Sequence, residues 1–238
     1  MGEQLLENPR ALNEALASAL GGTEVRQPGL SGFLNSRFDR FLNQLFASKA
    51  IDLRDAAAAL AGRPGFVWLQ RRPTPVEGLT VVETTQMTAR LDPDTEWASR
   101  AGEIADVRSR DDVDGWFDVY SAVFGADPRA RDEWQHIHAS LGPTGEGSLV
   151  LLLARVDGTP AATGALFFHE GVVGLYCFTT LENMRGLGLA TALVDASHQA
   201  ALARGVDRAV LQATGSGQPV YAKAGYEEEL ELSLLLMR

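Results

Sequence analysis

Residues 174–190 read GLYCFTTLENMRGLGLA and contain the strongest indication of the fold in this chain. The first part is apolar and rich in aromatic and β-branched side chains, so it predicts a strand over 172–180. Apolar residues at helical spacing follow the second glycine and predict a helix over 190–203. A turn that contains two glycines therefore connects a buried strand to a helix.

This turn has the chemistry of an anion cradle. A helix N-terminus carries about four N–H groups without internal partners, together with a partial positive charge. Gly186 and Gly188 let such a backbone come close to a ligand, and Ala190 is small enough to leave room. Arg185 adds a charged donor. The motif is neither the three-glycine dinucleotide fingerprint nor a Walker loop, and an ordinary strand–helix connection explains these six residues alone equally well.

The elements around the turn follow an α/β pattern. Strands are expected over 104–108, 148–155, 161–168, 209–211 and 230–236, and helices over 111–125, 129–141 and 219–224. Asp157-Gly158 is a hairpin signature between two of these strands. The helix after 172–180 is a crossover connection, so that strand and 209–211 should be parallel. The pattern predicts an α/β fold with a mixed sheet.

The first hundred residues are less informative. Apolar pairs recur at helical spacing from Ser31 to Phe46 and predict a helix there. An alanine-rich helix is expected over 52–61, and strands are expected over 66–69 and within 79–91. A polar stretch over 92–103 then separates the two regions. We therefore predict a smaller N-terminal α/β region over 1–103 and a second domain over 104–238.

Composition excludes several classes of protein. The 238 residues have a formal charge of −10 and globular hydrophobic content, which excludes collagen-like and disordered chains. Acidic charge disfavours nucleic acids and anionic membranes as partners. Cys177 is the only cysteine, and His136 and His138 are two residues apart, so we expect neither a disulfide framework nor a metal site. A signal peptide pattern and a long apolar run are both lacking, so we expect a cytoplasmic protein.

Three ordered elements resemble the GCN5-related N-acetyltransferase (GNAT) superfamily. The turn 185–190 matches its Arg/Gln-x-x-Gly-x-Gly/Ala loop, and residues 174–181 resemble its fourth strand. Residues 221–226, YAKAGY, resemble its Tyr-x-x-x-Gly-Phe/Tyr element. The resemblance covers roughly residues 104–238 and implies a mixed central sheet whose fourth and fifth strands splay apart. The N-terminal region at most resembles a degenerate half-copy, as in tandem members.

The resemblance also implies a site for acyl-CoA. The pantetheine arm would pair with the main chain of Phe178 and Thr180 between the splayed strands. The pyrophosphate would rest on the turn formed by Arg185, Gly186, Leu187, Gly188, Leu189 and Ala190. Thr214 falls where an asparagine or serine often contacts the cofactor, and Tyr221 matches the tyrosine that protonates the departing thiolate. A tyrosine packed beside the sheet is the alternative interpretation of Tyr221.

A general base is harder to identify. Members of the family often use a carboxylate on the fourth strand, but residues 172–180 contain no Asp or Glu. Glu182 is a candidate, although a solvated loop carboxylate is the commoner role for such a residue. Glu170 lies in a predicted turn. Tyr176, or water held by backbone carbonyls, is a further option.

The leading hypothesis is an N-acyltransferase that uses acyl-CoA, with acetyl-CoA as the default donor and no metal. A small-molecule amine would attack the thioester directly in a ternary complex. One alternative keeps the fold but takes the acyl group from a carrier protein or another unusual donor, or transfers it to oxygen. Another is a non-catalytic CoA-binding pseudoenzyme. The sequence predicts no oligomeric state.

Overall fold

The computed structural model describes residues 6–47, 51–70, 73–74, 76–95, 101–142 and 147–237. The helices are α1 (Glu7–Leu20), α2 (Leu53–Ala58), α3 (Arg110–Phe124), α4 (Arg131–Leu141), α5 (Leu189–Ala203) and α6 (Gln218–Lys223), with 3₁₀ turns η2 (Arg40–Leu42), η3 (Pro128–Ala130) and η4 (Glu182–Met184). The strands are β1 (Thr23–Gln27), β2 (Leu30–Leu34), β3 (Asn43–Ala47), β4 (Gly65–Leu69), β5 (Thr80–Arg90), β6 (Glu103–Asp106), β7 (Leu149–Val156), β8 (Thr159–His169), β9 (Val172–Thr180), β10 (Arg208–Ala213) and β11 (Glu227–Met237).

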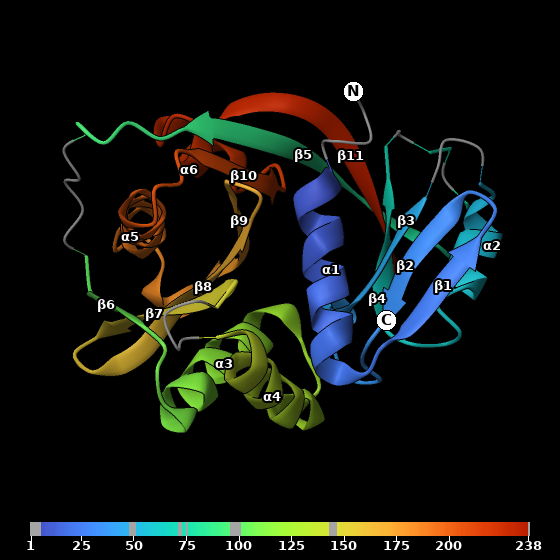
Figure 1. The fold of residues 1–238 in the computed structure, drawn as a ribbon, viewed down its shortest axis with the longest axis horizontal. Helices are drawn as coiled ribbons and strands as arrows, with labels where there is room; N and C mark the ends of the chain where they lie inside the picture. The colour runs from blue at the N-terminus through green and yellow to red at the C-terminus, as the bar shows by residue number, and fades with distance from the viewer. Residues whose placement is uncertain are drawn as a thin grey trace.

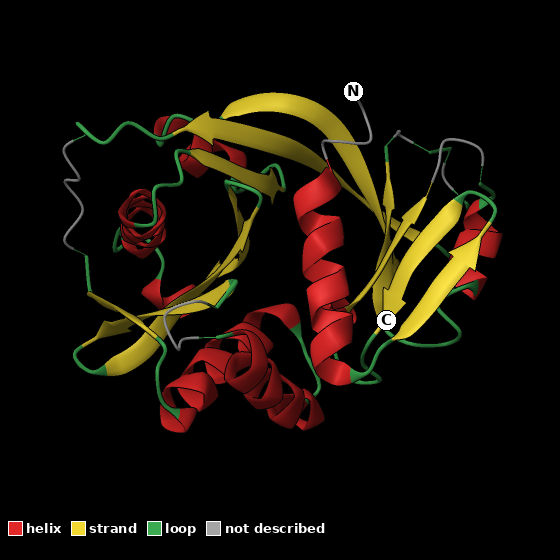
Figure 2. Cartoon of the chain, in the orientation of Figure 1, coloured by secondary structure: helices red, strands yellow, loops and turns green. Residues whose placement is uncertain are grey.

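In the described part of the chain, the strands form one mixed sheet of eleven, in the order β1-β2-β3-β4-β11-β5-β10-β9-β8-β7-β6. Neighbours are antiparallel except for β3 with β4 and β9 with β10. The sheet curves around α5, while α3, α4 and α1 lie on its other side (Figures 1 and 2). The mixed α/β sheet and the parallel pairing of β9 with β10 confirm the sequence predictions.

Two long strands are shared by both parts of the sheet. β5, which precedes residue 103 in the chain, lies between β10 and β11. β11 pairs with β5 along most of its length, and its last part, Ser233 to Met237, also pairs with β4. The sheet is therefore continuous across the predicted boundary at residues 103 and 104. The division into two domains stays a prediction.

The predicted helix over Ser31 to Phe46 is wrong. These residues form β2, the turn η2 and β3, and Phe33 pairs with Gln44 across the hairpin. A Cβ added at Gly32 would lie 2.2 Å from the carbonyl oxygen of Gln44, so glycine allows this close pairing. Apolar pairs separated by short polar stretches fit either structure, and pairing with β4 favours the strands.

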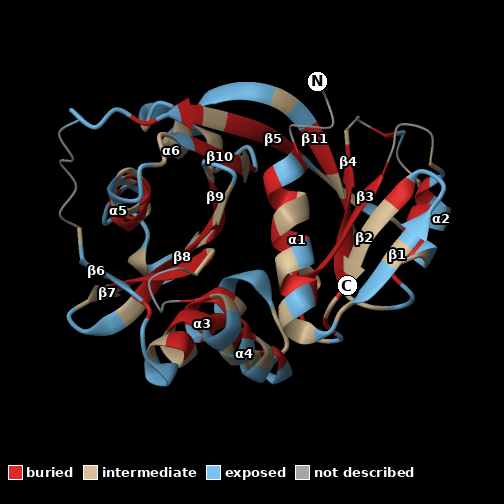
Figure 3. Cartoon of the chain, viewed as in Figure 1, coloured by how far each residue is buried: buried red, intermediate tan, exposed pale blue. Residues whose placement is uncertain are grey.

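Helix α1, which the sequence did not predict, connects the two parts of the molecule. Leu12 and Leu16 are buried with side chains of α3, α4 and β8, whereas Leu6 packs on β3, β4 and β11. Buried residues follow the strands and the inward faces of the helices (Figure 3). Within the described residues, no helix combines the length and the hydropathy that a membrane crossing requires.

The buried side chain of Leu235 tests the role of β11. Leu235 is fully buried and lies opposite Val67 of β4 and Val81 of β5. Leu235→Ala should lower the free energy of unfolding by about 2–5 kcal/mol, because it leaves a cavity between the two parts of the sheet. Leu187→Ala, at a side chain that is 52% exposed, should change it by less than about 0.5 kcal/mol in the same urea titration. Equal effects of the two changes would contradict this role.

Candidate functional site

The parallel strands β9 and β10 are paired over only three residues of each strand. Val173 to Leu175 pair with Ala209 to Leu211, and the ladder ends there although β9 continues to Thr180. The rest of β9 pairs with β8 on its other side. Backbone groups on the free edge of such a strand need other partners, and an extended ligand can supply them. The predicted splay of these two strands is confirmed.

A β-bulge begins at the point of separation. The register of β8 and β9 shifts between Thr163 and Ala165, and Cys177 has a left-handed φ of 55°. The Thr163 hydroxyl donates a 3.0 Å hydrogen bond to the carbonyl oxygen of Cys177. As a result, Tyr176 and Cys177 both enter the core beneath α3, and Phe178 packs against the core on the α5 side.

The bulge requires glycine in the neighbouring strand. A Cβ at Gly164 would lie 2.9 Å from the ring of Phe178. The indole N–H of Trp116 donates a 3.0 Å hydrogen bond to the carbonyl oxygen of Gly164, which holds the bulged region against α3. Gly164 therefore leaves the space that the ring of Phe178 occupies at the free edge.

The glycine turn after β9 is open. Gly186 and Gly188 have φ values of 79° and 80°, and Gly188 is the N-cap of α5 without a side-chain cap. Added Cβ atoms would meet nothing within 4 Å at Gly186, and a single atom, 3.4 Å away in Ala101, at Gly188. The first N–H group to bond backward is that of Ala192, to the carbonyl oxygen of Gly188.

The donors of this turn are therefore available. Among the described residues, none accepts a hydrogen bond from the N–H groups of residues 186–191. Arg185 and Leu187 are exposed and Ala190 is half-buried, whereas the side chain of Leu189 is buried in the core. Leu189 can contribute its N–H group but not its side chain. An uncapped helix start with open glycine backbone fits a phosphate group.

The remaining predicted site residues lie near the carboxyl ends of β9 and β10. Thr214 directly follows β10 and is exposed, and its hydroxyl oxygen lies 3.3 Å from that of Ser216. Because β9 and β10 are parallel, Thr180 and Thr214 come at the same end of the sheet. Glu182 is exposed in η4, between β9 and the glycine turn.

Tyr221 lies on α6, which is separated from β10 by four residues. Its ring packs edge-on against Tyr226 at a centroid distance of 5.8 Å, and burial raises its pKa to about 12. The amide of Gln218 donates a 2.7 Å hydrogen bond to the hydroxyl of Thr85, which ties the start of α6 to β5. Sequence reasoning missed this anchor, because the pairing of β5 with β10 has no local signal.

Tyr176 does not suit the role of a base. Its phenol donates a 2.6 Å hydrogen bond to Oδ1 of Asn8, and both residues are buried. Burial raises the pKa of Tyr176 well above its usual value. The phenolate that a base requires is disfavoured here. Asn8 lies on α1, a helix that was not predicted, so no local pattern pointed to this partner.

A family model described as an acetyltransferase (GNAT) domain matches residues 91–218, which is more than half of the chain. The chain belongs to this GNAT family. The family resemblance inferred from three short motifs is thereby confirmed. Acyl-CoA is the acyl donor of this family, so an open turn with free N–H groups beside a free strand edge is an arrangement expected of a member. A comparison with curated proteins finds no match.

Solved structures share the fold of this GNAT chain along nearly its whole length. A GCN5-related N-acetyltransferase from Kribbella flavida is 18% identical, with a TM-score of 0.64 over 95% of this chain and 94% of that one. A GCN5-related N-acetyltransferase-like protein from Streptococcus suis is 15% identical, with a TM-score of 0.60 over 100% of both chains. Identities this low show the fold alone.

A third structure matches part of a larger protein. It is described as a GCN5-related glucosamine N-acetyltransferase region in a fungal multi-domain β-N-acetylglucosaminidase. It is 15% identical, with a TM-score of 0.53 over 78% of this chain and 27% of that one. The GNAT fold is thus common to proteins whose remaining architecture differs.

His198 of the GNAT chain lies on the buried side of α5, close to the tyrosines. Its Nε2 is 3.0 Å from the hydroxyl of Tyr226, and burial lowers the pKa of His198 from 6.5 to about 4. The folded state therefore favours the neutral imidazole. The contribution of neutral His198 to the stability of the fold is complete above pH 6.5, the pKa of His198 in the unfolded chain. This contribution is lost as the pH falls towards 4, the pKa of His198 in the folded chain.

This shift predicts a measurable pH dependence of stability. At about 1.4 kcal/mol per pKa unit, His198 should account for about 3 kcal/mol of the stability lost between pH 6.5 and 4. His198→Gln keeps a polar side chain without this titration, so its unfolding free energy should decline less over the same interval. Urea unfolding at several pH values measures both curves. Parallel curves for the two proteins would contradict the assignment.

Proposed function

We propose that this GNAT-family chain transfers an acyl group from acyl-CoA, with acetyl-CoA as the default, to a small-molecule amine. The observation that carries the proposal is the end of the β9–β10 ladder at Leu175, next to an uncapped helix start at Gly188. A free strand edge and a row of free N–H groups suit the two ends of one ligand, an extended amide chain that ends in a diphosphate.

Residues of the turn would hold the phosphates. The N–H groups of residues 187–190 point out of the first turn of α5, where the helix dipole favours negative charge. Arg185 would add a charged donor from the exposed side. The main chain of Phe178 and Thr180 would bond the extended arm as an added strand, and Thr214 would contact it from the end of β10.

When bound, acyl-CoA supplies the activated thioester. The chain's part in the reaction is to hold the amine and the carbonyl carbon together and to polarise the carbonyl through a backbone N–H group. We propose that Tyr221 donates a hydrogen bond to the departing sulfur. With a pKa of about 12, Tyr221 stays protonated at neutral pH and is a weaker acid than a thiol. The hydrogen bond from Tyr221 therefore stabilises the departing sulfur before any transfer of the phenol proton to it.

Glu182 is the proposed acceptor of the amine proton, directly or through water. It is the acidic residue between the end of β9 and the glycine turn, and it is exposed to solvent. The formal charge of −10 favours the approach of a cationic amine over an acidic acceptor. Glucosamine, named for the fungal structural neighbour, is a small amine of this kind.

The same assay distinguishes this function from two alternatives with the same fold, transfer from an unusual acyl donor and CoA binding without catalysis. Purified protein is incubated with acetyl-CoA and a panel of small amines, and the released thiol is measured. Release that depends on the amine supports the proposal. Absence of release with every acceptor, together with transfer from a loaded carrier protein, would favour the unusual donor. CoA binding without turnover would favour a non-catalytic protein, as the lack of a β9 carboxylate allows.

The cofactor site is tested by Gly188→Glu. The new carboxylate would face the phosphates, so CoA binding measured by calorimetry should weaken at least about tenfold. Gly205→Glu is a matched control, because Gly205 also has a positive φ (72°) and open space around it, but follows the other end of α5. The control should bind CoA like the wild type. Unchanged affinity in Gly188→Glu would exclude this turn as the phosphate site.

The role of Tyr221 is tested by Tyr221→Phe. Loss of the hydrogen bond to the departing sulfur should lower kcat by about 100-fold, with little change in CoA affinity. Tyr226→Phe removes the neighbouring hydroxyl, which bonds to His198, and should affect stability more than kcat. An unchanged kcat in Tyr221→Phe would leave Tyr221 as a packing residue.

A further inference from the structure

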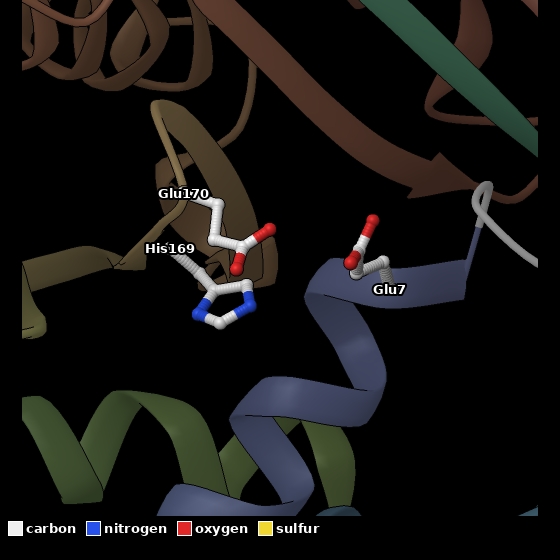
Figure 4. Close-up of side chains that lie close together, drawn as sticks. All are labelled: Glu7, His169 and Glu170. Atoms are coloured by element: carbon white, nitrogen blue, oxygen red, sulfur yellow. The ribbon is translucent and has the colours of Figure 1, made fainter.

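Three side chains that the proposed reaction does not use converge between α1 and the hairpin of β8 and β9. Glu7 is the first residue of α1, His169 is the last residue of β8, and Glu170 begins the turn to β9. One ligand atom from each lies within 4.8 Å of the others, and the close-up shows the two carboxylates and the imidazole facing a common space (Figure 4).

The three groups approach one another without bonding. In the part of the chain that the structure describes, no side chain of the three makes a hydrogen bond or an ion pair. Two carboxylates this close repel each other unless a positive charge lies between them. Ligand atoms around a divalent ion at about 2.0–2.2 Å lie roughly 3–4 Å apart, so a small rotation of each side chain would close the set.

Hydrogen bonds from the buried side chain of Asn8 fix the backbone that carries these three residues. Asn8, next to Glu7, donates through Nδ2 to the carbonyl oxygens of Phe167 (3.4 Å) and Val172 (3.5 Å), on either side of the turn. A Cβ at Gly174 would lie 2.0 Å from Oδ1 of Asn8, so the fit leaves no room for a side chain there. The ligand set is thus preorganised on two elements that are distant in sequence.

We propose that Glu7, His169 and Glu170 bind a divalent metal ion, best matched by zinc, that fastens α1 to the β8–β9 hairpin. Magnesium and calcium prefer sets made of oxygen alone, whereas zinc accepts imidazole with carboxylates and completes its shell with water. The role is structural. The cluster lies before Val172, at the opposite end of β9 from the glycine turn, and a nine-residue strand spans about 27–30 Å. The proposal is therefore independent of acyl transfer.

The direct test is titration of the tag-free full chain with zinc after dialysis against EDTA. The wild type should bind one equivalent saturably. His169→Ala and Glu170→Gln should each weaken the affinity at least about tenfold, since even residues that only support metal ligands account for 10- to 100-fold. Glu14→Gln, at an exposed position two turns further along α1, and His136→Ala are matched controls and should bind like the wild type.

A second measurement keeps the test independent of folding defects. Without metal, Glu170→Gln should unfold at the same temperature as the wild type or higher, because one of two repelling charges is removed. With zinc, the wild type should gain thermal stability and Glu170→Gln should not. Absence of saturable zinc binding, or binding unaffected by His169→Ala, would overturn the proposal. So would a raised KM for a cationic amine in these variants without any metal binding, which would assign the cluster to the acceptor.

Discussion

The constraint on which this protein depends is the early end of the ladder between two parallel strands. Beyond Leu175 and Leu211, β9 and β10 no longer exchange hydrogen bonds, and a continuous sheet would offer no free backbone edge to a ligand. The bulge at Cys177 sends the rest of β9 away from β10, and Gly164 makes room for the ring of Phe178 that this requires. Packing, rather than a flexible loop, thus keeps the edge open.

The second requirement is that the sheet holds together around this gap. β5 pairs with β10 on the side away from β9, and β11 pairs with both β5 and β4. These strands therefore stabilise β10, which loses its pairing with β9 after Leu211.

A buried carboxylate joins the two parts of the molecule on the other face of the sheet. Asp39 accepts hydrogen bonds from the hydroxyl of Tyr120 (2.9 Å) and the indole of Trp134 (2.7 Å). Burial raises the pKa of Asp39, and these donors oppose the rise. Side chains of the N-terminal part and of α3 and α4 are joined in this way.

Most elements after residue 103 were predictable because their signals are local. Asp157-Gly158 marks a hairpin by its backbone preference, and the glycine turn 185–190 marks a strand-to-helix connection. Before residue 103 the signals are ambiguous. Apolar pairs over 31–46 satisfy a helical period as well as two strands, and the choice is made by pairing with β4, a segment about twenty residues away. Helix α1 has no strong cap, since its N-cap Leu6 offers no side-chain bond.

The GNAT family, the mixed sheet and the position of the glycine turn could be predicted from the sequence, because each depends on a short run of the chain and its backbone chemistry. The tertiary structure alone decided that β5 enters the sheet between β10 and β11, that Asn8 engages the phenol of Tyr176, and that Glu7 meets His169. These contacts join residues about 120 to 170 positions apart. Their formation depends on the packing of whole elements, which no local pattern of residues encodes.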